Sequence, residues 1–197
     1  AAMKETADAE DRRPASEKKV DINWAETVKY IEKLQNKPEA GKDQEGGFFY
    51  KPGESKAGAI TNQAGVVVFR SFGSITYAGM LALVYANVNR DDIRVRSAFD
   101  WCVRNWTLEE NPGMGAQGLF FFFNVLTKCL SAFGTDAIPL ANGKTVNWRQ
   151  ELARKLVAGQ QVGDSGQGYW VNSNGSYWEN DATLVTAYTL VALEMID

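Results

Sequence analysis

The segment "NDATLVTAYTLVALEMI" (residues 180–196) carries one charged residue, Glu194, after Asp181. A second segment, "SITYAGMLAL" (74–83), aligns on "LVTAYTLVAL" (184–193) without a gap. A third, "GLFFFFNVLTKCLSAF" (118–133), is equally poor in charge. A helix that is apolar on every side is typically buried on every side. We therefore predict three buried inner helices.

Each buried segment follows an amphipathic one. The amphipathic segments, with large apolar residues at helical spacing, are "INWAETVKYIEKLQ" (22–35), "DIRVRSAFDWCVRNW" (92–106) and "VNWRQELARKLVAGQQ" (146–161). Loops rich in glycine and aromatic residues connect the two kinds of helix, at 46–53, 113–123 and 166–170. A unit of outer helix, loop and inner helix that occurs three times is typical of stacked helical hairpins.

The repeats predict an all-α chain in which the hairpins span about 22–90, 91–135 and 146–197. Strands are improbable in this scheme, and "GVVVFRSF" (65–72) is expected to be a short extended piece at most. The mixed-charge stretch 1–21 is interpreted as a tail or linker, because it holds few large apolar residues.

Composition excludes several classes of partner. The 197 residues are 45% hydrophobic and 23% charged, which is typical of soluble globular proteins. A net charge of -3 offers no electrostatic attraction for nucleic acid or an anionic membrane surface. We expect no transmembrane segment, because no run of about 18 apolar residues is free of charge. The compartment is unknown, and secretion stays open because a removed signal peptide leaves no trace.

The chain contains no histidine. This removes Ser-His and Cys-His nucleophilic arrangements and the commonest zinc ligand, so we predict no metal and no cofactor. Acid-base chemistry would have to come from carboxylates, Tyr, Lys or Cys. Cys102 and Cys129 lie in apolar helical contexts and are interpreted as buried free thiols, with a disulfide or a metal site as alternatives.

The stretch "GQGYWVNSNGSYWEND" (166–181) combines two Tyr-Trp pairs with two acids. Trp170 is expected to wedge between an outer helix and its inner neighbour. Tyr177 and Trp178 stand nearer the start of the last helix, where they either pack or line a cavity. Either Asn180 or Asp181 caps the last helix and Glu179 interacts favourably with the positive end of its dipole, or Glu179 and Asp181 are candidate catalytic acids.

The glycine-aromatic repeats carry a resemblance to a known family. In "LVAGQQVGDSGQGYW" (156–170), Gln160 or Gln161 is followed by Gly168 and Trp170, and "TLVTAYTLVALE" (183–194) is similar to the "TAWALLAL" segment of that family. Weaker copies lie at 34–48 and, without the glutamine, at 118–120. Residues 22–197 thus resemble the prenyltransferase and squalene-cyclase repeat proteins.

This resemblance implies an α/α toroid, and three hairpins make about half of an (α/α)6 barrel. It therefore implies a second half-toroid as partner, either another copy of the chain or a missing upstream segment. The triterpene cyclases of the family use an aspartic acid from an Asp-x-Asp-Asp cluster, which this chain lacks. Its protein prenyltransferases hold zinc with Asp, Cys and His. Asp100 and Cys102 have no histidine to complete that set.

Three functional hypotheses follow. The favoured one is a terpenoid-cyclase-like module for binding or assembly, without the family's catalytic motifs. The second is an enzyme that protonates an apolar isoprenoid substrate with Glu179 or Asp181. Its predicted substrate-binding residues are Tyr77, Phe120, Phe121, Phe123, Tyr177 and Trp178. The third, by analogy of fold alone, is an enzyme that acts on polysaccharide.

Overall fold

The computed structural model describes residues 2–18 and 22–197 of the chain, and residues 1 and 19–21 of the predicted tail lie outside the described residues. Its α-helices are α1 (Ala2–Asp11), α2 (Trp24–Glu32), α3 (Gly73–Tyr85), α4 (Ile93–Arg104), α5 (Leu119–Phe133), α6 (Trp148–Ala158) and α7 (Ala182–Ile196). Its strands are β1 (Ala59–Thr61), β2 (Val67–Phe69), β3 (Ala137–Pro139), β4 (Thr145–Asn147), β5 (Gln161–Val162) and β6 (Gly168–Tyr169). One-turn 3₁₀ helices lie at Ala15–Glu17, Pro38–Ala40 and Ser176–Trp178.

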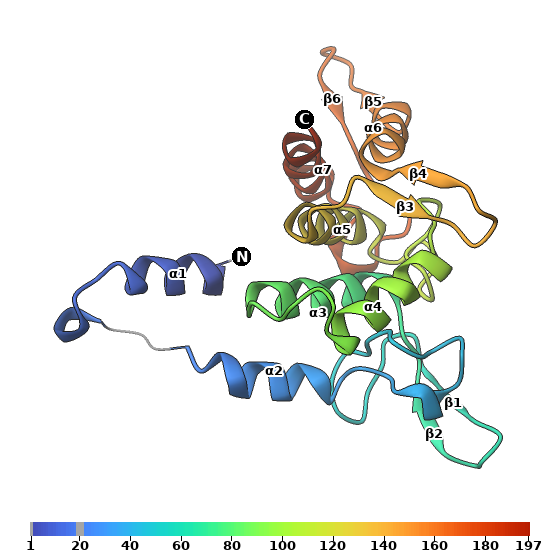
Figure 1. Cartoon of the computed structure of the whole chain (residues 1–197). Coiled ribbons are helices and arrows are strands. Elements are labelled where there is room, and N and C mark those ends of the chain that lie inside the picture. The colour runs from blue at the N-terminus through green and yellow to red at the C-terminus, as the bar shows by residue number, and fades with distance from the viewer. Residues whose placement is uncertain (1, 19–21) are drawn as a thin grey trace.

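The three apolar helices form a row with α5 in the middle. Helix α5 packs against α3 on one side and α7 on the other, as Figure 1 shows. Helices α2 and α4 pack on α3, and α6 packs on α7. The core fills the space between these helices with large side chains such as Tyr77, Phe122, Leu126 and Trp148. Each amphipathic segment thus covers part of the inner row.

The predicted all-α fold class is wrong. The chain is about 48% helix and 12% strand, so it is a mixed α/β protein. The strands form three separate two-stranded antiparallel sheets, β1–β2, β3–β4 and β5–β6, each closed by a short turn. In β3–β4 the turn contains Asn142 and Gly143, and Gly143 has a φ of 78° that glycine adopts without strain.

The prediction that residues 180–196 are buried all round is also wrong. Helix α7 buries Val185, Thr189 and Ala192, but it exposes a stripe that contains Leu190 and Val191. The stripe is exposed because α5 and α6 cover the other sides of α7 and no element of the described chain covers this one. The two cysteines, in contrast, are buried free thiols, as predicted.

The first and third hairpins each contain an equivalent hydrogen bond between the loop and the inner helix. The backbone N–H of Phe48 donates to Oγ1 of Thr76 over 3.0 Å, and that of Trp170 donates to Oγ1 of Thr186 over 3.1 Å. Thr76 and Thr186 are also matched in the ungapped alignment of 74–83 with 184–193. Both loops are therefore fixed to their inner helices in the same way.

The loop aromatics wedge between helices. Trp170 is buried, and its Nε1 donates to the carbonyl oxygen of Leu156 in α6 over 2.7 Å, which confirms the predicted wedge. On α3, a Cβ added at Gly79 would come within 2.6 Å of the Phe48 ring. The ring reaches its place because the helix has no side chain there.

Thr76→Val keeps the volume of this fully buried side chain but removes the acceptor for the Phe48 N–H. Leaving a buried donor unpaired costs about 1–3 kcal/mol, so we expect the free energy of unfolding in urea to fall by about that amount. The control is Thr183→Val, at an exposed position of α7, where a change within about 0.5 kcal/mol is expected. Equal effects of the two substitutions would show that the hydrogen bond is not what stabilises this junction.

Candidate functional site

A concave region of about 400 Å³ lies where the three inner helices meet the loops that precede them. We call it the aromatic hollow. Its lining residues come from α3, α5, α7 and those loops: Tyr50, Lys56, Ser74, Ile75, Ala78, Asn111, Met114, Gly118, Phe121, Tyr177 and Tyr188. Most of the lining is apolar, and its four rings come from segments that are far apart in the sequence. A mainly apolar concavity with a few polar groups is the usual form of a small-molecule site.

Two neighbouring aromatic residues beside the hollow have a strained backbone. Tyr177 and Trp178 have φ values of 60° and 64°, in the left-handed region. This conformation costs a residue with a side chain roughly 1–2 kcal/mol. Their rings are nevertheless 50% and 79% exposed, so they gain little from burial. Strain that folding does not reward is more frequent at functional sites than elsewhere.

Local hydrogen bonds hold this strained turn in place. Oδ1 of Asn172 accepts from the N–H of Asn174, and Oδ1 of Asn174 accepts from the N–H of Ser176. The N–H of Asp181 then donates to the carbonyl oxygen of Trp178. These short-range bonds keep the two rings at the surface, with Tyr177 in the wall of the hollow.

Glu179 is fully buried, and both of its carboxylate oxygens are occupied. Oε1 accepts from the backbone N–H of Phe121 over 2.7 Å, and Oε2 accepts from Nδ2 of Asn172 over 2.7 Å. Phe121 lies in the first turn of α5, which begins after Gly118, a residue without a side chain to cap it. Glu179 therefore supplies both the acceptor and the negative charge that this helix N-terminus favours.

Helix α3 is likewise capped by a residue that is far away in the sequence. The buried side chain of Asn111 accepts from the N–H of Ser74 through Oδ1 and donates to the Ser74 hydroxyl and the Gln117 carbonyl oxygen through Nδ2. Asn111 belongs to the loop before α5, and Glu179 to the loop before α7. Each capping side chain therefore comes from the hairpin that follows. Helix α7 is capped by its own Asp181, which accepts from the N–H groups of Thr183 and Leu184.

The structure separates the predicted substrate-binding residues into two groups. Phe121 and Tyr177 line the hollow, and the exposed Trp178 follows Tyr177 directly. Tyr77 and Phe123 are buried in the core, and Phe120 packs edge-on against Phe123. The two predicted acids are not among the residues that line the hollow. Their geometry is that of capping residues.

Several residues of the hollow were not predicted from the sequence. Tyr188 and Met114 are apolar residues within segments that were interpreted as packing or loop, and Tyr50 is the last aromatic of "GGFFY" (46–50). Tyr50 and Met114 belong to the glycine-aromatic loops, so the sequence indicated their loops but not their place in the hollow. No local signal distinguishes Tyr188 from the buried residues around it, because its position depends on the contact of its ring with Phe121.

Lys56 places a positive charge at the hollow. Its Nζ lies 2.6 Å from Oε1 of Glu54 and 4.9 Å from the centre of the Tyr50 ring. Hydrogen bonds from Lys51 and Lys56 lower the pKa of Glu54 to about 2, and the hydrogen bond to Glu54 raises the pKa of Lys56. Both groups therefore stay ionised at neutral pH, and the wall of the hollow keeps a cation.

Within the described part of the chain, no group of three or more His, Cys, Asp or Glu side chains could hold a metal ion. None of the helices within residues 2–18 and 22–197 is long and apolar enough to span a bilayer.

Comparisons with protein-family models, with curated proteins and with solved structures give no match for this chain. The resemblance to prenyltransferase and squalene-cyclase repeats therefore stays a prediction from the sequence. The function has to be argued from the geometry.

Glu179→Gln tests the role of the buried acid. The amide keeps one acceptor but turns an N–H₂ group toward Asn172 or Phe121, which are both donors, and it removes the charge at the start of α5. A hydrogen bond to a charged group contributes about 1.5–3 kcal/mol, and we expect the free energy of unfolding to fall by about that amount in urea titrations. Asp181→Asn is the matched control and should have little effect, because Asn and Asp cap helices equally well. Unchanged stability of Glu179→Gln would rule out the capping role.

Proposed function

We propose that this chain is a binding or assembly module and that the aromatic hollow binds a ligand with a flat apolar face. One observation carries the proposal. No carboxylate lines the hollow: Glu54 beside it is paired with Lys51 and Lys56, and both oxygens of Glu179 are engaged within the fold. The rings of Phe121, Tyr177 and Tyr188 remain available to a ligand.

The isoprenoid-enzyme hypothesis is supported less well by this geometry. Protonation of an alkene needs a carboxylic acid that keeps its proton and directs it into a closed apolar cavity. Both oxygens of Glu179 accept hydrogen bonds from within the fold, and Asp181 caps α7 at the surface. The available contacts therefore favour binding over proton transfer.

A polysaccharide ligand is the second candidate, and the exposed rings of Tyr177 and Trp178 favour it. A sugar ring presents a flat face of C–H groups that can lie on an aromatic ring, while a hydroxyl such as that of Ser74 can bond its edge. Cleavage of a glycosidic bond commonly needs two carboxylates about 5–10 Å apart across the bond. No carboxylate lines the hollow, so we propose binding of the sugar and not its hydrolysis.

The assembly part of the proposal concerns a partner that continues the row of hairpins. Helix α7 ends this row with an exposed apolar stripe, whereas α5 is covered on both sides. A second copy of the chain or another helical protein could cover that stripe. This part of the proposal is independent of what the hollow binds.

The hollow can be tested with the fluorescent probe anilinonaphthalene sulfonate, whose rings suit the aromatic lining and whose sulfonate suits Lys56. Phe121→Ser removes a partly exposed ring of the hollow. Loss of one aromatic contact is worth about 1.5–3 kcal/mol, so the dye should bind at least tenfold more weakly. The matched control is Tyr30→Ser, at an exposed ring of α2 outside the hollow, which should leave the dissociation constant unchanged.

A panel of soluble oligosaccharides, titrated by isothermal titration calorimetry, separates the two ligand classes. Binding that is lost in Trp178→Ala identifies a sugar ligand. Dye binding that is equal in the wild type, Phe121→Ser and Tyr30→Ser would refute the hollow as the binding site.

A further inference from the structure

The first and third hairpins are equivalent residue by residue at their glutamines. An isolated bridge pairs Gln35 with Phe48. The register of β5 and β6 pairs Gln161 with Tyr169, and one further step places Gln160 opposite Trp170. Phe48 and Trp170 are already equivalent through their hydrogen bonds to Thr76 and Thr186. Gln160 is therefore the counterpart of Gln35.

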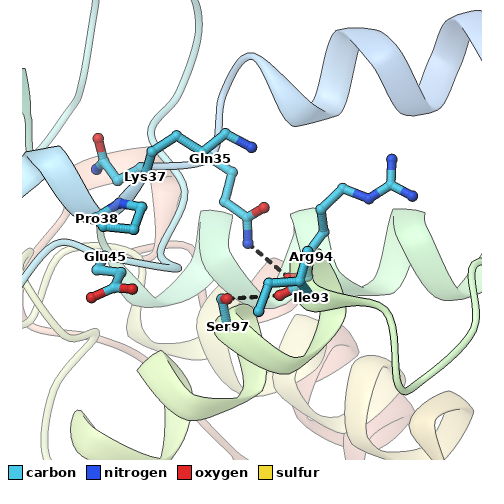
Figure 2. Close-up of a pocket in the computed structure, with 8 residues that line it drawn as sticks. Gln35, Lys37, Pro38, Glu45, Ile93, Arg94 and Ser97 are labelled. Atoms are coloured by element: carbon cyan, nitrogen blue, oxygen red, sulfur yellow. Dashed lines mark hydrogen bonds between the residues drawn. The ribbon is translucent and has the colours of Figure 1, made fainter.

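Gln35 shows what such a glutamine binds. Its side chain is buried, and Nε2 donates to the carbonyl oxygens of Gly46 and of Arg94, over 3.0 Å and 2.8 Å. Arg94 lies in the first turn of α4, so the glutamine joins the first hairpin to the next outer helix. Figure 2 shows this junction, with the Gln35 amide directed at the α4 backbone beside a small hollow of about 170 Å³.

Within the described chain, Gln160 lacks an outer-helix partner such as Arg94. Its amide covers Gly168, where a Cβ would approach Nε2 within 2.3 Å, whereas a Cβ at Gly46 would meet the backbone of Ser97 in α4. The Gln160 side chain is exposed, and no outer helix of the described chain lies beyond it. The position taken by α4 at the first hairpin is open at the third.

The inner helix of the third hairpin has an equally open side. In α3, Tyr77, Met80 and Leu81 are buried, and the Tyr77 ring contacts Phe122 of α5. The alignment of the two helices matches these residues with three exposed residues of α7: Ala187, Leu190 and Val191. Helix α7 thus exposes the stripe with which α3 binds the next inner helix.

Two differences in sequence between the first and third hairpins make this end of the row apolar. Counted from the glutamines, Glu32 and Lys37 of the first hairpin correspond to Val157 and Val162 of the third, and both valines are more than 60% exposed. In the first hairpin, Glu32 pairs with Arg94 across the junction. A helix that docks at the third hairpin should therefore have a small apolar residue where α4 has Arg94.

Helix α2 meets this requirement. Asn23 caps α2 and Asp92 caps α4, so the second helical residue is Ala25 in α2 and Arg94 in α4. Ala25 is exposed, and α2 lies at the end of the molecule opposite α6 and α7, as Figure 1 shows. An Ala25–Val157 contact would replace the Arg94–Glu32 pair.

We infer that the α6–α7 edge, formed by Val157, Gln160, Val162, Ala187, Leu190 and Val191, binds the α2–α3 hairpin of a second copy of this chain. The contact is head to tail: Gln160 donates to the first turn of the partner's α2, and the α7 stripe packs against the partner's inner helix. The inference rests on the assembly part of the proposed function and is independent of the hollow. A cluster of exposed apolar residues on one edge can mark a protein interface.

The test measures the mass of the chain in solution by sedimentation velocity over a range of concentrations. We expect the wild type to associate with itself, and both Leu190→Glu on the α6–α7 edge and Ala25→Glu on α2 to weaken the association at least tenfold. Both positions are exposed, and glutamate is compatible with a helix, so circular dichroism should show the fold unchanged. The matched control is Val67→Glu, at an exposed valine of β2, which should not affect the association.

A mixture of the two variants identifies the head-to-tail arrangement. Leu190→Glu retains an intact α2 surface, and Ala25→Glu retains an intact α6–α7 edge, so the mixture should form heterodimers through one intact contact although neither variant associates alone. A wild type that stays monomeric at all concentrations would overturn the inference. If only Leu190→Glu had an effect, two α7 stripes would face each other, and the head-to-tail contact would be refuted.

Dye binding separates this result from the proposed binding function. Leu190→Glu should leave the dissociation constant of the dye unchanged, because Leu190 does not line the aromatic hollow. Association that is lost with unchanged dye binding locates the two functions on separate surfaces. Equal loss of dye binding and association in Leu190→Glu would show that the α6–α7 edge and the aromatic hollow are not separate surfaces.

Discussion

The N–H groups in the first turns of the inner helices are shielded from water and need hydrogen-bond acceptors from the protein. This requirement determines how the loops in the middle of the molecule contact the inner helices. Helix α5 starts after a glycine and helix α3 after a phenylalanine, so neither has a capping side chain of its own. Glu179 and Asn111 fill that place from the loops of the following hairpins. Since a buried unpaired N–H costs about 1–3 kcal/mol, the first and second hairpins each depend on the following hairpin for part of their stability.

The same capping brings the candidate site together. Glu179 ties the strained turn of Tyr177 and Trp178 to the start of α5, and Phe121, whose N–H it accepts, lies in the hollow itself. Asn111 likewise lies in the wall of the hollow while it caps α3. Glu179, a candidate catalytic acid in the sequence, thus positions residues of the hollow without lining it. The ring surfaces that it positions are the part that a ligand can reach.

Dependence on a following hairpin also explains the open end of the row. The third hairpin carries counterparts of the groups that join the first hairpin to its neighbour, a glutamine paired with the loop aromatic residue and an inner-helix stripe, but within the described chain it has no successor. At that end Val157 and Val162 stand where the first hairpin has Glu32 and Lys37, which suits contact with an apolar partner more than with water. Repetition within one chain therefore indicates how a second chain can bind.

The sequence by itself determined the six helices that follow the tail, because a helix needs only the local spacing of apolar and polar residues, and the cap at Asp181 was readable for the same reason. Of the substrate-binding residues predicted from the sequence, Phe121 and Tyr177 line the hollow, whereas Trp178 follows Tyr177 outside its lining. The sheets were missed, although the turn at Asn142 and Gly143 was a visible signal, because strands of two or three residues have no periodicity to detect. Only the tertiary structure decided which rings share the hollow, why Glu179 is occupied, and that one side of α7 is bare, because each of these depends on contacts between residues far apart in the chain.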